Sequence, residues 1–169
     1  MKPSFKVFSV LALAGSLWMV GCGGADASRS VKMGQEQSFT LKNLEGKEIS
    51  FESVLSSHKA VLINFWATWC PPCREEIPDL IKLQEQYKDK SFTVLGIDVG
   101  ESAKKVSLVA QKIGINYPVL LDGEQQVSEA YGIVGIPTSY LVSSDGKVIG
   151  EYHSASPKLF ADVEKAVVS

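Results

Sequence analysis

The sequence predicts an α/β protein in which a central mixed sheet is flanked by helices. Strand-like and helix-like segments alternate through most of the chain, which places helices on both faces of a sheet. Two strand segments, residues 60–66 and 92–97, are almost unbroken apolar runs, as in strands buried on both faces. The last two strand segments flank Asp145-Gly146, a hairpin signal, and an antiparallel hairpin makes the sheet mixed.

The composition is that of a single globular domain. The chain has 169 residues, of which 45% are hydrophobic and 21% charged. This length suits one domain preceded by a leader. Without Lys2 and Lys6 of the leader, 15 basic side chains (17 − 2) remain against 19 acidic ones, a balance of −4. Such a balance gives no support to nucleic-acid binding.

Residues 1–21 have the features of an export signal. Two lysines precede an apolar run over residues 7–20, which is shorter than the roughly 20 residues that a membrane-spanning helix needs. The stretch MVGC at residues 19–22 resembles the lipobox of bacterial lipoproteins, with Met19 where leucine is usual. The resemblance implies that Cys22 carries lipid. A transmembrane anchor and a plain secretory signal are the alternatives.

A flexible tether is expected over residues 22–37, which are rich in Gly, Ser, Ala and charge and lack an apolar period. Its reach would be roughly 20 Å, enough to hold a domain just off a membrane surface. The globular domain is expected over residues 38–169.

The domain opens with a predicted hairpin. Phe39 and Leu41, then Ile49 and Phe51, alternate with polar residues on either side of a turn at residues 43–47.

A buried strand over 60–66 and a helix over about 71–88 follow. The helix carries Pro78, which lacks an N–H and crowds the preceding turn, so we expect a kink there and no stop. Its apolar residues recur at helical spacing: Ile77, Leu80, Ile81, Leu83 and Tyr87.

Strands and helices alternate in the remaining part of the chain. Gly114 and Gly132 are expected to end two of the helices. The predicted elements are a strand at 92–97, a helix at 102–113, a short strand at 118–121, a short helix at 124–131, hairpin strands at 138–142 and 147–152, and a helix at 157–168.

The motif WATWCPPC over residues 66–73 lies where a buried strand ends and a helix begins. Free N–H groups and the positive end of the dipole at a helix N-terminus lower a thiol pKa. We expect Cys70 at the cap with its sulfur exposed, and Cys73 on the buried side of the helix. Cys70 would then attack a partner disulfide, and Cys73 would resolve the mixed disulfide.

Two other interpretations of this pair are weaker. A structural zinc site needs about four ligands, and the chain offers no second cysteine pair, only the isolated His58 and His153. A structural disulfide that closes so short a loop removes little unfolded-state entropy. No metal and no other cofactor is expected.

From about Gln37 onward the chain resembles the TlpA/ResA-type thioredoxin-like proteins of bacterial envelopes, which include reductases for cytochrome c maturation. The resemblance rests on NFWATWCPPC, on Pro78 in the following helix, on the insert near residues 102–121, and on GIPT at residues 135–138. It implies a thioredoxin-like fold with an N-terminal hairpin and a central helix–strand insert.

The same resemblance implies a binding site for a partner peptide. Pro137 corresponds to the cis-proline that faces the cysteines in thioredoxin folds and offers backbone to the partner. Ile136, Trp69, Pro71 and Pro72 are expected to complete this site.

Glu76 is the third predicted catalytic residue. The strand position six before the first cysteine, where thioredoxin usually has a buried aspartate, is Asn64, which cannot accept a proton. Glu76 follows Cys73 by one turn on the same side of the helix and could take its proton. The envelope reductases carry a glutamate at this place. The alternative is that Glu76, like Glu75, simply favours the start of a helix.

Because neither Pro71 nor Pro72 can donate an N–H to the Cys70 sulfur, the thiolate is less stabilised than it could be, which favours a reductant over an oxidant. The expected partners are exported proteins with disulfides, a membrane electron donor that re-reduces the protein, and the membrane itself through Cys22. The expected location is the bacterial cell envelope, with the domain facing the periplasm or extracytoplasmic space.

Two rival functions stay open. A peroxiredoxin-like peroxidase shares the fold but needs Pro, Thr and Cys at fixed spacing, and no proline stands in the strand before Cys70. A non-enzymatic lipoprotein with a passive disulfide would keep its function after Cys70→Ser.

Overall fold

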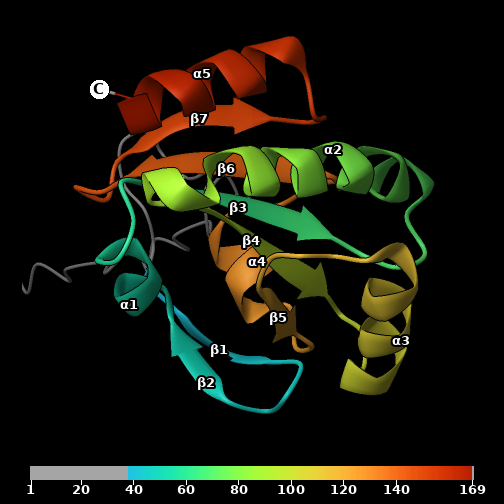
Figure 1. The fold of residues 1–169 in the computed structure, drawn as a ribbon. Coiled ribbons are helices and arrows are strands. Elements are labelled where there is room, and N and C mark those ends of the chain that lie inside the picture. The colour runs from blue at the N-terminus through green and yellow to red at the C-terminus, as the bar shows by residue number, and fades with distance from the viewer. Residues whose placement is uncertain (1–37, 169) are drawn as a thin grey trace, which may run out of the picture.

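The computed structural model describes residues 38–168 (Figure 1). The strands are β1 (Thr40–Asn43), β2 (Glu48–Ser50), β3 (Ala60–Trp66), β4 (Phe92–Val99), β5 (Val119–Asp122), β6 (Thr138–Ser143) and β7 (Val148–Tyr152). The helices are α1 (Phe51–Leu55), α2 (Pro71–Tyr87), α3 (Ala103–Ile113), α4 (Gln126–Ala130) and α5 (Pro157–Val168), with a 3-10 turn η1 (Lys88–Lys90) after α2. The predicted leader and tether, including Cys22, lie outside the described residues.

The seven strands form one mixed sheet in the order β2-β1-β5-β4-β3-β6-β7. Strand β4 runs parallel to β3 and β5, and the other pairs are antiparallel. The mixed sheet expected from the sequence is therefore confirmed, and α3 with β5 forms the predicted insert. The parallel strands all end at one edge of the sheet, and the antiparallel β6 begins at that edge, because Thr138 pairs with Phe65.

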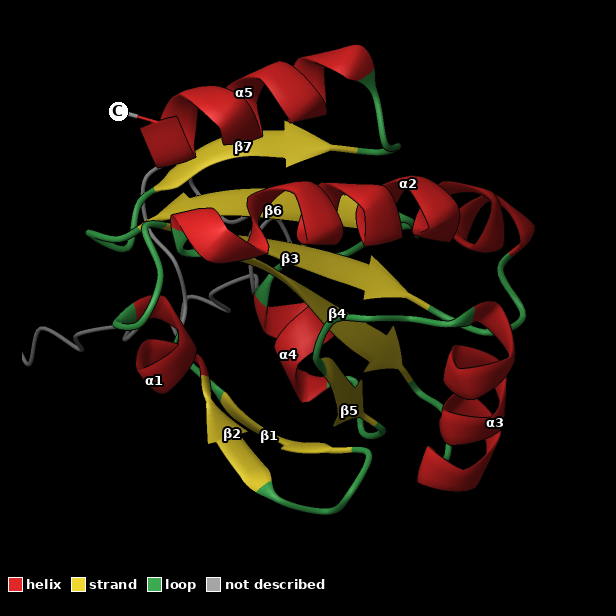
Figure 2. Ribbon diagram, viewed as in Figure 1, coloured by secondary structure: helices red, strands yellow, loops and turns green. Residues whose placement is uncertain are grey.

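Helices cover both faces of the sheet (Figure 2). Apolar side chains of α2, α3 and α5 pack on one face in a core cluster that includes Leu62, Trp66 and Val94. Helices α1 and α4 pack on the other face in a second cluster that includes Phe65 and Ile97. Successive residues of β3 and β4 thus enter opposite cores, as the unbroken apolar runs predict.

Helix α1 was not predicted from the sequence, and placing Phe51 in a strand was wrong. Ser50 ends β2 and caps α1 by accepting a hydrogen bond from the Ser53 N–H at 3.3 Å. Phe51 is instead the first helical residue, fully buried, with its ring 5.1 Å from that of Phe39. A helix of five residues is too short to show a helical period, so its apolar residues gave no signal.

The other element types are as predicted. Helix α2 runs through Pro78 without stopping, whereas the kink expected there stays a prediction. Gly114 follows α3 in the left-handed conformation at φ 80°, which glycine adopts without steric cost. Within residues 38–168, no helix is both long and apolar enough to cross a membrane.

Candidate active site

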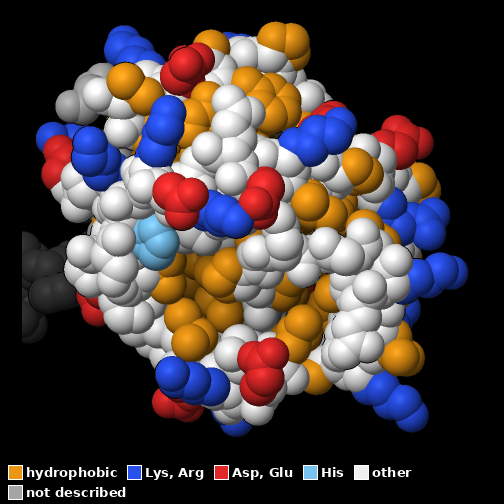
Figure 3. Space-filling view, viewed as in Figure 1, with side chains coloured by type: hydrophobic (Ala, Val, Ile, Leu, Met, Phe, Trp, Pro, Cys, Tyr) orange, Lys and Arg blue, Asp and Glu red, His pale blue; other side chains and the backbone are white. Residues whose placement is uncertain are grey.

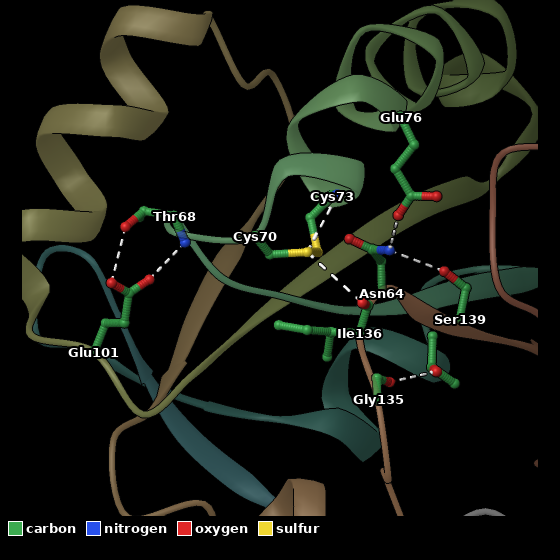
Figure 4. The surroundings of a disulfide bond; sticks show 10 residues. Asn64, Thr68, Cys70, Cys73, Glu76, Glu101, Gly135, Ile136 and Ser139 are labelled. Carbon is green, nitrogen blue, oxygen red and sulfur yellow. Dashed lines mark hydrogen bonds between the residues drawn. A yellow bond between two sulfur atoms is a disulfide. The ribbon is translucent and has the colours of Figure 1, made fainter.

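Cys70 and Cys73 lie where β3 gives way to α2, at the edge where the parallel strands end. Cys70 is the N-cap residue of α2, with Pro71 and Pro72 in the first turn. Its sulfur accepts a hydrogen bond from the Cys73 N–H at 3.2 Å, and the two sulfurs form a disulfide (Figure 4). The helix N-terminus therefore directs an N–H that has no acceptor within the helix at the Cys70 sulfur, as the position of the motif predicts.

The exposed sulfur expected for Cys70 is not observed. Cys70 is only 2% exposed, against 0% for Cys73. The disulfide turns the Cys70 sulfur back toward the helix, and the segment before β6 closes over it, with the Ile136 carbonyl oxygen 3.7 Å away. The large exposed side chain beside the disulfide is Trp69, at 62%. A partner would therefore meet Trp69 before it reaches the sulfur.

The predicted peptide-binding residues gather around the disulfide. The Ile136–Pro137 bond is cis, as the resemblance implied. Sheet register places this segment beside the cysteines, because β6 begins opposite the end of β3. Pro71 and Pro72 are exposed at the start of α2. The role of these residues in binding a partner stays a prediction.

Glu76 and Asn64 face each other in the core behind the disulfide. The Asn64 Nδ2 group donates hydrogen bonds to Glu76 Oε1 at 2.8 Å and to Ser139 Oγ at 2.9 Å (Figure 4). Asn64 is fully buried and Glu76 is 7% exposed. Burial raises the pKa of Glu76, and hydrogen bonds from Asn64 and the Ala155 backbone lower it by less. A carboxyl group of this kind is suited to carry a proton.

Sequence reasoning missed a pair of carboxyl groups, Asp98 and Glu101, at the same edge of the sheet. Asp98 is fully buried on β4 directly beside Trp66 of β3. Glu101 accepts hydrogen bonds from the Thr68 N–H at 2.5 Å and the Thr68 hydroxyl at 2.8 Å (Figure 4). The sequence did contain a signal, because a carboxylate inside an apolar strand is rare without a partner.

The two histidines lie apart, as the sequence indicated. His58 contacts the Val54 carbonyl oxygen after α1, and His153 lies after β7 near Thr138. Within residues 38–168, no three His, Cys, Asp or Glu side chains are arranged to hold a metal ion.

The class of the protein follows from the order of its strands, from the helices on both faces of the sheet and from the position of the two cysteines. It is a thioredoxin-like thiol-disulfide oxidoreductase. The family model described as AhpC/TSA matches residues 34–150. The thiol-disulfide oxidoreductase ResA of Bacillus thuringiensis is 33% identical over 147 residues, which cover 86% of this chain and 84% of that protein. The chain belongs to the AhpC/TSA family and to its ResA-type thiol-disulfide oxidoreductases.

Solved structures agree with this assignment. The thioredoxin domain of a thiol-disulfide oxidoreductase from Bacteroides vulgatus matches with a TM-score of 0.74 at 29% identity, covering 82% of this chain and 99% of that one. A thiol:disulfide interchange protein from Chlorobium tepidum matches with a TM-score of 0.66 at 34% identity, covering 82% and 97%. The thioredoxin-like fold implied by the motif is confirmed.

Proposed function

We propose that this oxidoreductase works as a disulfide reductase on exported proteins of the bacterial cell envelope. The Cys70 thiolate attacks the disulfide of a partner, and one partner sulfur leaves as a thiolate. The Cys73 thiolate then attacks the Cys70 sulfur, which forms the Cys70–Cys73 disulfide and frees the second partner sulfur. Two electrons pass to the partner, and Glu76 takes the proton that Cys73 loses.

The observation that carries this proposal is that an attacking cysteine and a buried carboxyl group occur in the same helix start. Cys70 is the N-cap residue and accepts the Cys73 N–H, and the buried Glu76 lies one helical turn after Cys73. A helix N-terminus favours the thiolate that attacks. A buried carboxyl group with a raised pKa can take a proton from the resolving thiol. Trp69, Pro71, Pro72, Ile136 and Pro137 would receive the partner chain around the sulfur.

The reducing direction is supported by the few donors that reach Cys70. The one N–H that donates to its sulfur among the described residues is that of Cys73, and the prolines between the cysteines add none. A weakly stabilised thiolate makes the dithiol a better electron donor.

We expect the reduction potential to lie nearer the roughly −270 mV of thioredoxin than the roughly −120 mV of the strongest disulfide oxidants. Equilibration of the protein against glutathione buffers, with the thiol state read by mass after alkylation, measures it. As a comparison, Pro72→His places an imidazole beside the sulfur and should raise the potential, because a nearby cation stabilises the thiolate. A wild-type potential near −120 mV would contradict the reducing direction.

The proposed location rests on the sequence of the leader. Residues 1–21 would direct export, Cys22 would carry lipid, and residues 22–37 would tether the domain of residues 38–169 outside the membrane. Acidic and basic side chains are both scattered over the face that Figure 3 shows. A membrane protein that supplies electrons is the second partner this location requires.

We expect Cys22 to be lipid-modified. Cells labelled with a radioactive fatty acid should yield labelled protein in the membrane fraction, and Cys22→Ser should abolish the label because the acceptor thiol is gone. Cys70→Ser is the matched control and should keep it. An unlabelled wild-type protein in the soluble fraction would refute the anchor.

Peroxidase activity and a passive disulfide are the competing functions. A peroxidase would consume hydrogen peroxide through Cys70 with turnover, whereas a reductase would turn over with a protein disulfide. A passive clasp would do neither.

Exported apocytochromes c, whose haem-binding cysteines must be reduced, are the substrates to test first.

A further inference from the structure

Asp98 ends up in an unusual position for a carboxyl group. It is fully buried on the α2 face of β4, with Trp66 of β3 beside it on one side and Leu121 of β5 on the other. Within residues 38–168, no donor reaches either of its oxygens in ordinary hydrogen-bond geometry, and the nearby Glu101 N–H has only a smaller effect on its pKa. A buried carboxylate without donors is strongly disfavoured, so this group is more stable when it holds a proton.

The neighbouring carboxylate, Glu101, is a possible acceptor for the O–H of a protonated Asp98. The side chain of Glu101 is 4% exposed. It accepts hydrogen bonds from Thr68 and forms an ion pair with Lys105. Burial raises the pKa of Glu101, but the hydrogen bonds from Lys105 and Thr68 outweigh that effect and lower it. The pKa of Glu101 is thus lowered while that of Asp98 is raised, so that a protonated Asp98 would be the donor and an ionised Glu101 the acceptor of the pair.

Glu101 connects this pair to the redox site. It receives both the backbone N–H and the hydroxyl of Thr68, which lies two residues before Cys70. These bonds fix the segment that joins β3 to α2 and carries the exposed Trp69. The order of contacts is thus Asp98, Glu101, Thr68 and then the cysteine loop.

We propose that Asp98 is a positioning residue of the redox site, which donates its proton to Glu101 and thereby holds the Thr68–Cys70 segment in place. The proposal goes beyond the reductase function, and its rate test rests on that function. Asp98 touches no reacting atom and acts through Glu101.

The pair would respond to pH. Burial first, and then the hydrogen bond and charge of Glu101, raise the pKa of Asp98 to about 8, against smaller lowering effects from the Glu101 N–H and Lys105. Glu101 and Lys105 are the charged groups that act most on Asp98. Above this pH, two carboxylates would face each other, the O–H donor would be lost, and the Thr68 segment would loosen.

The oxidised full-length protein allows a test in which Cys70 and Cys73 do not titrate, because they are joined in the disulfide. We expect the tryptophan emission of the wild type to change with a midpoint near pH 8, because Trp66 lies beside Asp98 and Trp69 follows Thr68. Asp98→Asn, which keeps a donor but cannot ionise, should lose this transition.

Asp122→Asn is the matched control. Asp122 is also buried at the end of a parallel strand, but its oxygens accept the N–H groups of Val127 and Ser128. This variant should keep the transition near pH 8. A wild type without the transition, or an Asp98→Asn variant that retains it, would overturn the proposal, whatever the direction of electron flow.

The rate of reduction of a model protein disulfide at pH 7 tests the positioning role. Asp98→Leu removes the donor and should slow the reaction about tenfold, the effect of one lost hydrogen bond of about 1.4 kcal/mol. Asp98→Asn should restore most of that rate. Near-UV circular dichroism checks that both variants fold. A folded Asp98→Leu variant that reacts as fast as the wild type would refute the role. If Asp98→Leu does not fold, a reaction rate of Asp98→Asn about tenfold below that of the wild type would refute it as well.

Discussion

Cys70→Ser is expected to reduce disulfide exchange with a protein substrate to the uncatalysed background, because serine supplies no thiolate to attack the disulfide. Cys73→Ser has a different effect. Its Cys70 still attacks, but no thiol remains at position 73 to release the mixed disulfide, so the partner stays bound through Cys70. Both outcomes are visible on non-reducing gels of protein isolated from cells, followed by mass spectrometry of the captured partner.

The trapped partner would also decide between the proposed substrate classes. Covalent capture of exported proteins with paired cysteines by Cys73→Ser, and its absence in the Cys70→Ser, Cys73→Ser double variant, would support the reductase. Absence of disulfide reduction by the wild type, together with an unchanged cellular function of Cys70→Ser, would show that the disulfide is passive. Loss of peroxide consumption in Cys70→Ser, with no protein captured by Cys73→Ser, would favour the peroxidase.

The main architecture could be predicted from the sequence because long elements carry strong patterns. Residues 60–66 and 92–97 are apolar on both faces, and the structure buries β3 and β4 in two cores. Asp145-Gly146 marks the hairpin of β6 and β7. Short elements carry weaker patterns, which is why α1 was missed and Phe51 was placed in a strand.

The part of the candidate site that depends on neighbouring residues in the chain was predicted from the sequence. The WATWCPPC motif predicts two cysteines at the start of a helix, and helical spacing predicts that Glu76 lies on the side of Cys73. The burial of Cys70 was not predictable, because it depends on the Ile136 segment, which is 66 residues away in the chain and arrives through the pairing of β6 with β3.

Asp98 and Glu101 could not be assigned for the same reason. Their link to Thr68 spans 33 residues and exists because β3 and β4 end side by side. From the sequence, Glu101 is an ordinary acidic residue before a helix. The topology of the sheet, and not local spacing, brings this pair of carboxyl groups to the cysteines.

Glu76→Gln is expected to slow release of the mixed disulfide by roughly 10²-fold or more, the usual effect of losing a general acid or base. Glutamine keeps the side-chain shape and an oxygen that can accept the Asn64 Nδ2 hydrogen bond, so the fold should persist. It cannot take the proton that Cys73 must lose before it attacks. Asn64 cannot replace it, because an amide does not accept a proton in this pH range.

The pH profile separates this role from a structural one. Burial raises the pKa of Glu76 above its ordinary value, so the carboxylate that accepts the proton forms only as the pH rises through that raised pKa. The wild-type release rate should therefore rise with pH over that range, and Glu76→Gln should lack this rise. Stopped-flow measurement of mixed-disulfide release at a series of pH values tests both expectations.

Glu75→Gln provides the matched control, because it removes one negative charge from the same helical turn at an exposed position. Its release rate and pH profile should match those of the wild type. A Glu76→Gln variant that also matches the wild type in both would show that Glu76 only favours the start of α2 through the helix dipole. If Glu75→Gln is slowed as much as Glu76→Gln, the effect comes from net charge near the cysteines and not from a proton held beside Cys73.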